Sequence, residues 1–382
     1  MILLPLMACC LSALLPDVMS DARLQIIRER IDVLDEQLQA LINERAGLAQ
    51  EVAQVKIAAD AERAVFYRPE REAQILRKVV ERNQGPLPGE EMARLFREIM
   101  SACLALERPM RVAYLGPEGT FTQAATLKHF GHSVQTISLP TIVEVFREVE
   151  AGSADYGVVP VENSTGGIVG HTLDILLDTP LKVAGEVELR IHQHLMGRMR
   201  DLAEVRRIYS HSQSLLQCRA WLDTNLPGVE RIDVSSNAEA ARRATIEDGA
   251  AAIAGEVAAG LYGLSVLAQN IEDQPDNTTR FLVLGRKSVP PSGKDKTSVL
   301  VATRNKPGAL YHLLAPLAQH GVSMSRIESR PSRQGMWEYV FFLDIEGHAE
   351  ESRVAVALQE LAAEASLFKL LGSYPKALLN GN

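Results

Sequence analysis

The stretch "RVAYLGPEGTFTQAA" (residues 111–125) decides the fold class, because the sequence pattern changes there. It indicates a short apolar strand, a glycine-rich turn and the start of a helix. After Pro109, short apolar runs alternate with stretches of helical spacing. Such alternation predicts an α/β domain with a largely parallel sheet. The expected strands lie at residues 111–116, 133–138, 156–162, 207–211 and 251–255.

Residues 20–108, which precede this stretch, have the apolar spacing of helices. Two shorter helices are expected near 69–82 and 89–106, separated by the breaker "GPLPG". The first helix is long and must bury its apolar stripe against other helices or another chain. The residues of that stripe recur at intervals of three, four and seven: Leu24, Ile27, Ile31, Leu34, Leu38, Leu41 and Leu48.

The C-terminal part of the chain follows a polar linker. The linker is "KSVPPSGKDK" (287–296), a polar segment that contains Pro and Gly. Residues 297–378 then alternate compactly as strand, helix, strand, strand, helix, strand. This βαββαβ order predicts a ferredoxin-like domain.

Composition excludes several classes of function. The chain has 382 residues and a net charge of −8, without a block of like charges, which argues against nucleic acid or an anionic membrane surface as the main partner. His192 and His194 share a face of one strand, but no cysteine or acidic cluster lies near them in sequence, so we expect no metal and no cofactor. The four cysteines lack zinc-ligand spacing and a disulfide pattern: Cys9, Cys10, Cys103 and Cys218.

Residues 1–19 form an apolar extension. The run "MILLPLMACCLSALLP" is too short to span a membrane, no Lys or Arg precedes it, and no clear cleavage site follows. Met19 starts "MSDARLQIIRERI", which is typical of a cytoplasmic start. We therefore expect a cytoplasmic protein with an upstream extension; export by a signal peptide is the alternative.

Cationic residues on the first helix suggest an anion site. Arg45 and Lys56 are 11 residues apart, so they share one helix face about 16 Å apart along the axis. Arg28 points about 100° away from Arg45 and could serve a different pocket, such as that of a partner chain. A solvated charged face is the alternative.

The run "IIRERIDVLDEQLQALINERAGLAQEVAQVK", followed by "YRPEREAQIL", resembles the all-helical chorismate mutase family over nearly all of 20–108. The resemblance implies a pericyclic rearrangement of chorismate, in which the protein holds the substrate folded and stabilises charge on the breaking ether oxygen. It implies that Arg45, with Arg28 of the partner subunit, clamps the two carboxylates. Lys56 would donate to the ether oxygen.

The second helix and the third helix supply the remaining mutase residues in this resemblance. Arg71 would support the site, and Glu72 would accept from the substrate hydroxyl group. Arg68 stands where the family has an aspartate, and Glu107 stands where some members have a glutamine. A carboxylate cannot donate, so Glu107 would have to be protonated to serve the ether oxygen.

Polar side chains follow several of the expected strands in the α/β region. Open α/β sheets bind ligands at such strand ends, so we expect one shared cleft rather than separate turns. In "DQPDNTTRFLVLG" (273–285) small hydrogen-bonding groups precede one arginine, which suits a small anion carrying a hydroxyl group. The cleft residues expected from the sequence are Thr120, Thr122, Glu162, Asn163, Ser164, Ser212, Gln213, Asn277, Thr279, Arg280 and Phe281.

The motifs "GPEGTFT", "VPVENS", "HSQSLLQC" and "NTTRF" resemble the prephenate dehydratase family over roughly 111–286. The resemblance implies two α/β lobes around a cleft, as in bilobal solute-binding proteins, and conversion of prephenate to phenylpyruvate. It implies that Arg280 holds a carboxylate, Asn277 shapes the turn, and Thr279 hydrogen-bonds or protonates the departing hydroxyl group. Glu162 is an alternative acid.

The C-terminal domain resembles the ACT family of small-molecule sensors through "NKPGALYHLL" and "IESRP". The resemblance implies L-phenylalanine bound between two such domains of a homodimer, with feedback inhibition. The residues that match the binding motifs are Asn305, Gly308, Ala309, Leu310, Glu328, Ser329 and Arg330.

Together these patterns predict a multidomain enzyme: a helical mutase domain, a bilobal α/β dehydratase domain and a ferredoxin-like regulatory domain. A monofunctional dehydratase with a helical dimerisation region is one alternative. A non-catalytic binding protein for aromatic acids, built on the bilobal fold, is the other.

Overall fold

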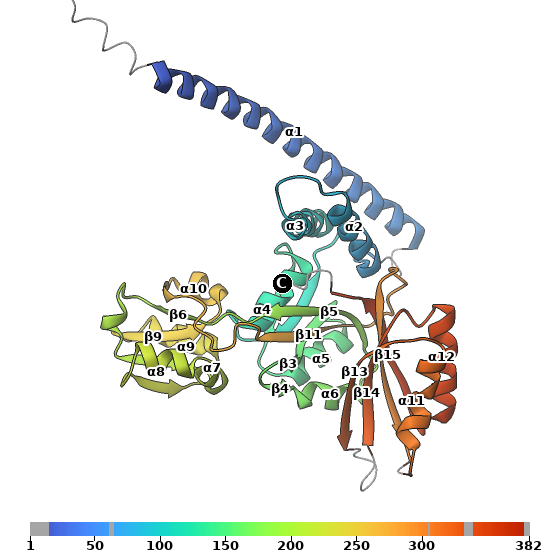
Figure 1. The fold of residues 1–382 in the computed structure, drawn as a ribbon. Helices are drawn as coiled ribbons and strands as arrows, with labels where there is room; N and C mark the ends of the chain where they lie inside the picture. Colours follow the sequence, from blue (N-terminus) through green and yellow to red (C-terminus); the bar gives the residue numbers. More distant parts are fainter. Residues whose placement is uncertain (1–14, 61–64, 305, 332–338, 378–382) are drawn as a thin grey trace, which may run out of the picture. The chain divides into compact units, whose positions relative to one another are not determined.

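A computed structural model describes residues 15–60, 65–304, 306–331 and 339–377 of the chain (Figure 1). The chain divides into two compact units, with the boundary between Phe66 and Tyr67. Among the described residues, the first unit holds one helix and the second holds the three sheets.

The first unit is the long helix α1 (Leu15–Asp60), 46 residues in length. The apolar stripe predicted from the sequence lies on it and is about half exposed in the single chain, from 46% for Leu24 to 62% for Leu41. Helices in proteins are stabilised mainly by burial of an apolar face. The expectation that this stripe packs against other helices or another chain stays a prediction.

The second unit begins with two helices that pack on each other. They are α2 (Pro69–Arg82) and α3 (Gly89–Glu107). Proline at the first position of α2 is favourable, because its missing N–H would have no partner inside the helix. Leu76, Ala93 and Met100 form the small core between the two helices.

Next in the chain is a sheet of strands in the order β2-β1-β3-β11-β5, with β4 paired to β3. Helices α4 (Phe121–Phe130), α5 (Ile142–Ala151) and α6 (Gly170–Leu176) belong to this lobe. Its strands are β1 (Arg111–Leu115), β2 (Gln135–Leu139), β3 (Tyr156–Asn163), β4 (Gly167–Ile168), β5 (Lys182–Arg190) and β11 (Thr278–Gly285).

A second sheet forms the other lobe, with strand order β10-β6-β9-β7-β8. Its strands are β6 (His194–Gly197), β7 (Arg207–Ser210), β8 (Glu230–Asp233), β9 (Ala250–Ala254) and β10 (Ser265–Ala268). Its helices are the 3₁₀ turn η1 (Leu202–Glu204), α7 (Ser212–Gln217), α8 (Arg219–Asn225), α9 (Asn237–Ala244) and α10 (Glu256–Tyr262).

Both sheets are mixed, whereas the sequence predicted a largely parallel sheet. Strand β1 is parallel to β2 and β3, but β11 is antiparallel to both β3 and β5. The reason is the path of the chain. It leaves the first lobe after β5, builds the second lobe, and returns as β11, which inserts between β3 and β5 from the opposite end.

The third sheet confirms the predicted βαββαβ order, with strands arranged as β13-β14-β12-β15. Helices α11 (Ala309–Gln319) and α12 (Ser352–Glu364) belong to its domain, and α12 buries Val354, Ala357 and Leu361. The strands are β12 (Asp295–Thr303), β13 (Met324–Pro331), β14 (Tyr339–Glu346) and β15 (Leu367–Pro375).

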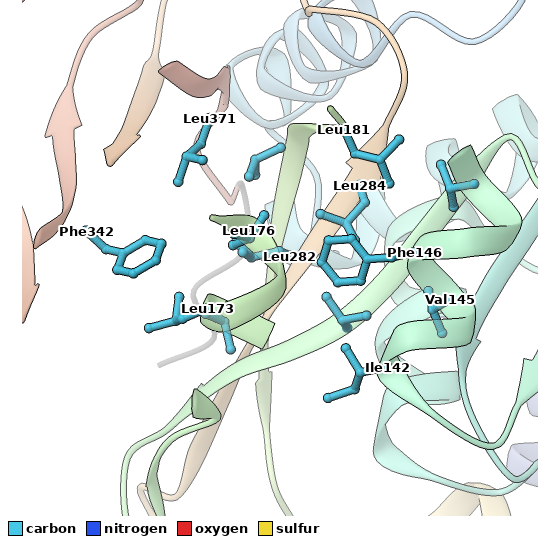
Figure 2. Packing of buried hydrophobic residues seen from close by; sticks show 14 of the residues in the cluster. Ile142, Val145, Phe146, Leu173, Leu176, Leu181, Leu282, Leu284, Phe342 and Leu371 are labelled. Atoms are coloured by element: carbon cyan, nitrogen blue, oxygen red, sulfur yellow. The ribbon is translucent and has the colours of Figure 1, made fainter. Parts of the chain in front are cut away.

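The first and third sheets share one apolar core (Figure 2). Phe342 and Leu371 come from the third sheet and join a cluster that contains Leu173 and Leu176 of α6. Gly372 allows the closest approach, because a Cβ there would stand 2.1 Å from the backbone oxygen of Val183 on β5. The third sheet is therefore packed directly on the lobe that carries β11.

Candidate functional site

The start of β11 is held by a hydrogen-bond network centred on Asn163. Thr279 is paired in register with Asn163 on β3. The amide nitrogen of Asn163 donates to Thr279 Oγ1 at 2.8 Å and to Asn277 Oδ1 at 2.9 Å. The Asn163 oxygen accepts from the Thr165 hydroxyl at 2.8 Å and from the Gly166 N–H at 2.6 Å. Because Thr279 Oγ1 already accepts a hydrogen bond, its own hydrogen is left to donate elsewhere.

Thr279 lines a cleft between the two α/β lobes with a volume of about 310 Å³. The volume lies at the lower end of the range for small-molecule sites. The first lobe contributes Leu115, Gly116, Thr120, Phe121, Thr122, Pro160, Asn163, Val169, Thr279 and Phe281, followed by Ile191 and Gln193 at the crossing between the lobes. The second lobe contributes His211, Gln213, Ser214, Gln217, Ser235, Ser236 and Asn237.

The cleft is lined by neutral groups. Among the residues for which the structure gives positions, no lysine or arginine lines it, and His211 is its one titratable side chain. Helices α4 and α9 both begin at the cleft, with Thr120 and Ser236 as their N-caps. Free N–H groups and the helix dipole make such helix starts suitable partners for carboxylates.

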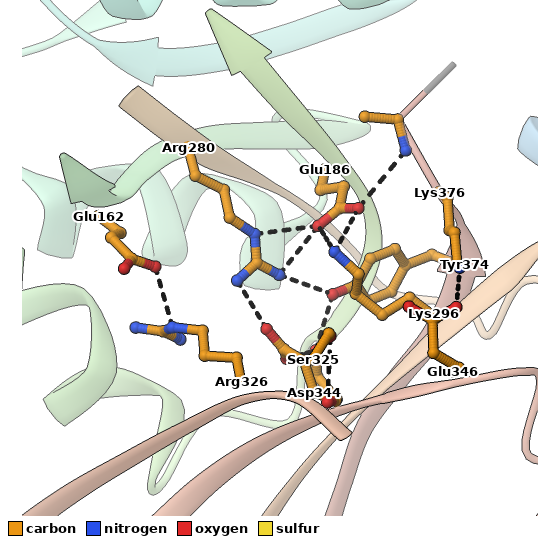
Figure 3. Close-up of polar contacts among 12 residues, drawn as sticks. Glu162, Glu186, Arg280, Lys296, Ser325, Arg326, Asp344, Glu346, Tyr374 and Lys376 are labelled. Atoms are coloured by element: carbon orange, nitrogen blue, oxygen red, sulfur yellow. Dashed lines mark hydrogen bonds and ion pairs between the residues drawn. The ribbon is translucent and has the colours of Figure 1, made fainter. Parts of the chain in front are cut away.

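Arg280, which the sequence led us to expect as the partner of a substrate carboxylate, is not among the residues that line this cleft. Successive side chains of a strand point to opposite faces, and Thr279 and Phe281 line the cleft on one face of β11. On the other face, the Arg280 guanidinium group donates to Glu186, Asp344 and Tyr374 (Figure 3). Its hydrogen-bonding capacity is used inside the protein.

Glu162 is likewise outside the cleft lining. Its carboxylate accepts from Arg326 Nε at 2.9 Å, in an ion pair with the third sheet (Figure 3). The arrangement therefore gives no support to Glu162 as an acid in the cleft. Ser164 accepts from the N–H of Thr278 at 3.0 Å and supports the turn, together with the buried Asn277.

Of the two motif residues predicted in the second lobe, one lines the cleft and the other does not. Gln213 lines the cleft, but Ser212, one residue earlier, is exposed and does not. Thr120 and Thr122 of the first lobe both line the cleft as expected, and Phe281 lines it while also belonging to a buried core.

Sequence reasoning missed several cleft residues, of which Gln193 is the most buried at 1% exposure. Its amide nitrogen donates to Ser214 Oγ at 3.0 Å and to Gln217 Oε1 at 3.2 Å. Ser214 and Gln217 follow Gln213 on α7 and are themselves part of the quoted motif "HSQSLLQC", so the polar residues of that motif were the available signal. Ser235 and Ser236 precede α9 and Asn237 is its first residue, and this polar helix start was the available signal.

The cationic residues predicted for a mutase site lie on α1. Arg28 is exposed, while Arg45 and Lys56 are half-buried. The Lys56 ammonium group stands over the Phe66 ring, 5.6 Å from its centroid, which is a cation–π contact.

The remaining predicted mutase residues lie on or beside α2 and α3. Arg71 is exposed, and Arg68 pairs with Glu70 at 2.6 Å. Glu107 ends α3 and is half-buried. Glu72 accepts from Arg97 Nε at 3.4 Å, so a substrate hydroxyl group would have to share or displace that contact.

The surroundings of Glu72 form a small cavity of about 50 Å³ that also includes His129 and Lys128. Burial raises the pKa of Glu72 above its usual range, although the charge of Arg97 opposes the rise. Burial and the charge of Arg97 lower the pKa of His129 to about 3. The ring of His129 is therefore neutral at physiological pH.

The regulatory residues predicted from the ACT motifs lie on two elements of the third domain. Gly308 has φ +78°, a conformation that favours glycine, and precedes Ala309 and Leu310 at the start of α11. Glu328 and Arg330 lie on one face of β13 and Ser329 on the other. Asn305 lies outside the described residues.

Arg330 links β13 to the first lobe, because its guanidinium group pairs with Asp174 of α6 at 3.2 Å.

Within the described parts of the chain, no helix is both long and apolar enough to cross a membrane. No group of three or more His, Cys, Asp or Glu side chains is placed to hold a metal ion in those same parts.

Three family descriptions match the chain in sequence order. Chorismate mutase type II matches residues 27–108, prephenate dehydratase matches 112–289, and the ACT domain matches 297–363. A bifunctional chorismate mutase/prephenate dehydratase from Stutzerimonas stutzeri is 60% identical over 365 residues, which is 94% of this chain and 100% of that protein.

Solved structures resemble the part of the chain after the mutase match. A prephenate dehydratase from Arthrobacter aurescens, in complex with L-Phe, is 38% identical with a TM-score of 0.65; the match covers 70% of this chain and 90% of that chain. GqqA, described as a quorum quenching acylase, is 31% identical with a TM-score of 0.65; the match covers 70% of this chain and 98% of that chain. Proteins of one fold thus carry different activities, and the residues of the site must decide between them.

Proposed function

The chain belongs to the family of bifunctional chorismate mutase/prephenate dehydratases, and we propose that the cleft between its two α/β lobes is the dehydratase site, with Thr279 as the donor to the departing hydroxyl group. It is an enzyme that carries both domains on one chain, together with an ACT domain. The observation that supports Thr279 most directly is its hydrogen bond from Asn163, which also lines the cleft.

The reaction needs one proton and no added electrons. The C–C bond to the ring carboxylate of prephenate breaks and CO₂ leaves. Its electron pair moves through the ring diene, which becomes aromatic, and expels the ring hydroxyl group. That group takes a proton from Thr279 and leaves as water, and the threonine oxygen regains a proton from solvent.

A threonine hydroxyl group is a weak acid, so its surroundings must help. Asn163 donates to Thr279 Oγ1, which draws electron density from the O–H bond and strengthens it as a donor. The same hydrogen bond fixes the direction in which the hydrogen can point. Loss of CO₂ and aromatisation of the ring drive the departure of the hydroxyl group. A well-positioned hydrogen-bond donor is therefore sufficient, and a strong acid is not needed.

The two carboxylates of prephenate need partners in a cleft lined by neutral groups. We assign them to the starts of α4 and α9, which are capped by Thr120 and Ser236 and where the first main-chain N–H groups have no partner inside the helix. Neutral donors hold an anion without the strong attraction of an arginine. This suits a reaction in which one carboxylate must lose its charge and depart as CO₂.

The mutase reaction is assigned to residues 27–108, which match the type II chorismate mutases. Arg45 and Arg28 of the partner subunit are proposed to bind the carboxylates of chorismate, and Lys56 its ether oxygen. Arg71 would support the site, and Glu72 would accept from the substrate hydroxyl group. Arg68 and Glu107 stand at the two positions where the chain departs from the family pattern.

The ACT domain is proposed to bind L-phenylalanine and to lower dehydratase activity when it does. The support is the family match at 297–363 and the structure of a similar prephenate dehydratase in complex with L-Phe. A homodimer is proposed as well, since the exposed apolar stripe of α1 requires a partner surface.

The Thr279→Ala variant tests the dehydratase site. We expect kcat for prephenate to fall at least about 100-fold, because loss of a positioned proton donor has an effect of that order. Chorismate consumption by the same preparation should be unchanged. Thr278→Ala is the matched control, because the Thr278 hydroxyl donates to the backbone oxygen of Asp276 in the turn. Turnover of Thr279→Ala within a few-fold of the wild type would remove Thr279 from the mechanism.

A further inference from the structure

Arg280 is next to Thr279 in sequence, and every nitrogen of its guanidinium group has a partner. Nε donates to Glu186 at 2.9 Å, Nη1 donates to Asp344 at 2.6 Å, and Nη2 donates to the Tyr374 hydroxyl at 3.1 Å. Figure 3 shows the three partners converging on the guanidinium group from different strands. A group bound on three sides has little freedom to rotate.

The partners belong to two domains. Glu186 lies on β5, beside β11 in the first sheet. Asp344 lies on β14 and Tyr374 on β15, both in the third sheet. Lys296 of β12 completes the cluster by donating to both oxygens of Glu186, at 2.7 and 2.8 Å. Two cations thus face two carboxylates, and the formal charges cancel.

The cluster is buried. The Arg280 side chain is 10% exposed, that of Asp344 7% and that of Glu186 2%. Burial by itself would raise the pKa of Asp344, but the charge of Arg280 and the hydrogen bond from Ser298 hold it below its usual range. Asp344 is therefore ionised at neutral pH. Removing one partner from a buried ion pair is costly, because a buried charge is left without compensation.

The third sheet makes a second contact, with strand β3, at the residue that is paired with Arg280. Arg280 is paired in register with Glu162 on β3, and Glu162 accepts from Arg326 of β13. One residue further along β3 is Asn163, the donor to Thr279. The third sheet therefore anchors both strands that carry the proposed dehydratase donor and its hydrogen-bonding partner.

We propose that Asp344, in the domain that matches the ACT family, is a positioning residue for the dehydratase reaction. It holds Arg280, and the fixed Arg280 sets the orientation of β11, so that Thr279 presents its hydroxyl group to the cleft on the opposite face. This inference rests on the proposed role of Thr279. It assigns to the third sheet a direct part in dehydratase turnover in the absence of any regulatory ligand.

Asp344→Asn in the full-length protein tests the proposal. The substitution keeps the size and an oxygen acceptor but removes the charge. We expect kcat for prephenate to fall about 10–100-fold, the effect of displacing a reacting group by a fraction of an ångström to one ångström. KM for prephenate should change by less than about threefold, and chorismate consumption should stay at the wild-type rate.

Glu346→Gln is the matched control. It makes the same change of charge two residues along β14, where the carboxylate pairs with Lys376 and does not contact Arg280. Its dehydratase kcat should equal that of the wild type. An equal loss in both variants would show a general weakening of the third sheet and would overturn the proposal.

A double variant separates positioning from a purely structural role. If Asp344 acts through Thr279, adding Asp344→Asn to Thr279→Ala should not lower the residual turnover further. A further drop of the same factor as in the single variant would contradict action through Thr279. If Asp344→Asn does not fold, Tyr374→Phe takes its place, because it removes only one hydroxyl partner of Arg280; unchanged kcat in that variant would count against the proposal.

The two hypotheses fail in different ways. Wild-type turnover in Thr279→Ala would refute the proposed dehydratase site itself. Loss of turnover in Thr279→Ala together with wild-type kcat in Asp344→Asn would refute the positioning role alone.

Discussion

Charged and neutral residues are separated around β11. On one face of the strand, Thr279 opens into a cleft lined by hydroxyl and amide groups. On the other face, Arg280 lies in a buried cluster with Glu186 and Asp344. The charged side chains are thus paired with one another inside the protein, whereas neutral side chains line the cleft that we propose as the dehydratase site.

The buried His129 predicts that the stability of the protein depends on pH. Its ring contacts Phe130 and the Tyr67 hydroxyl group, and its pKa is lowered to about 3, first by burial and second by the charge of Arg97. In the unfolded chain a histidine has a pKa of about 6.5. Between these values the unfolded chain binds a proton that the folded chain does not, so stability falls as pH falls.

From this group alone, we expect the free energy of unfolding to drop by about 1–2 kcal/mol between pH 7.5 and pH 5. His129→Gln should lose that part of the pH dependence, and the exposed His171→Gln should keep it. Denaturant unfolding at the two pH values measures the difference. Equal pH dependence in the wild type and His129→Gln would contradict a neutral buried ring.

The sequence located the motif around Thr279, but it could not predict which groups the neighbouring side chains contact. "NTTRF" contains a proposed donor and, on the next residue, an arginine that pairs with Glu186 and Asp344; an arginine beside a polar turn is equally compatible with binding an anion. The partner of Arg280 is Asp344, 64 residues later, and this contact becomes visible only in the structure. Long-range ion pairs of this kind leave no local pattern in a sequence.

At the scale of elements, helices were easier to predict than strands. The spacing of apolar residues gave α1, α2 and α3, because one helix face must be apolar whatever it packs against. The strand β5 was missed: it carries Glu186 and Glu188, and charged residues in a strand usually indicate exposure. Glu186 is buried because Arg280 and Lys296 compensate its charge.

Close packing between β15 and β5 contributes to the stability of the protein. Gly372 is buried, and a Cβ atom there would stand 2.1 Å from the backbone oxygen of Val183, which cannot move without shifting the strand. Gly372→Ala should therefore lower the free energy of unfolding by about 1–3 kcal/mol, as overpacking typically does.

Gly260→Ala is the control for this substitution. Gly260 lies inside α10 and a Cβ there would meet nothing within 4 Å, so the change should be neutral or stabilising by up to about 1 kcal/mol. Thermal or denaturant unfolding of the two variants gives the comparison. A Gly372→Ala protein as stable as the wild type would show that β15 and β5 are less tightly packed than described.

At the scale of the whole molecule, the chain joins two successive reactions and a regulatory domain. The domain order follows from the sequence motifs, and the ferredoxin-like order of the third domain was predicted correctly. The shared core between the first and third sheets was not predicted, because the apolar residues of both sheets are equally compatible with separate domains. This core makes the third domain part of the dehydratase structure.

Phenylpyruvate formation by the purified full-length protein tests the account most directly. One reaction is started with chorismate and another with prephenate, each with and without L-phenylalanine. The account predicts phenylpyruvate from both substrates, with less product when L-phenylalanine is present. Product from prephenate alone would show that the helical region has no mutase activity and serves only a structural role. Binding of prephenate without product from either substrate would contradict the dehydratase cleft and favour a binding protein.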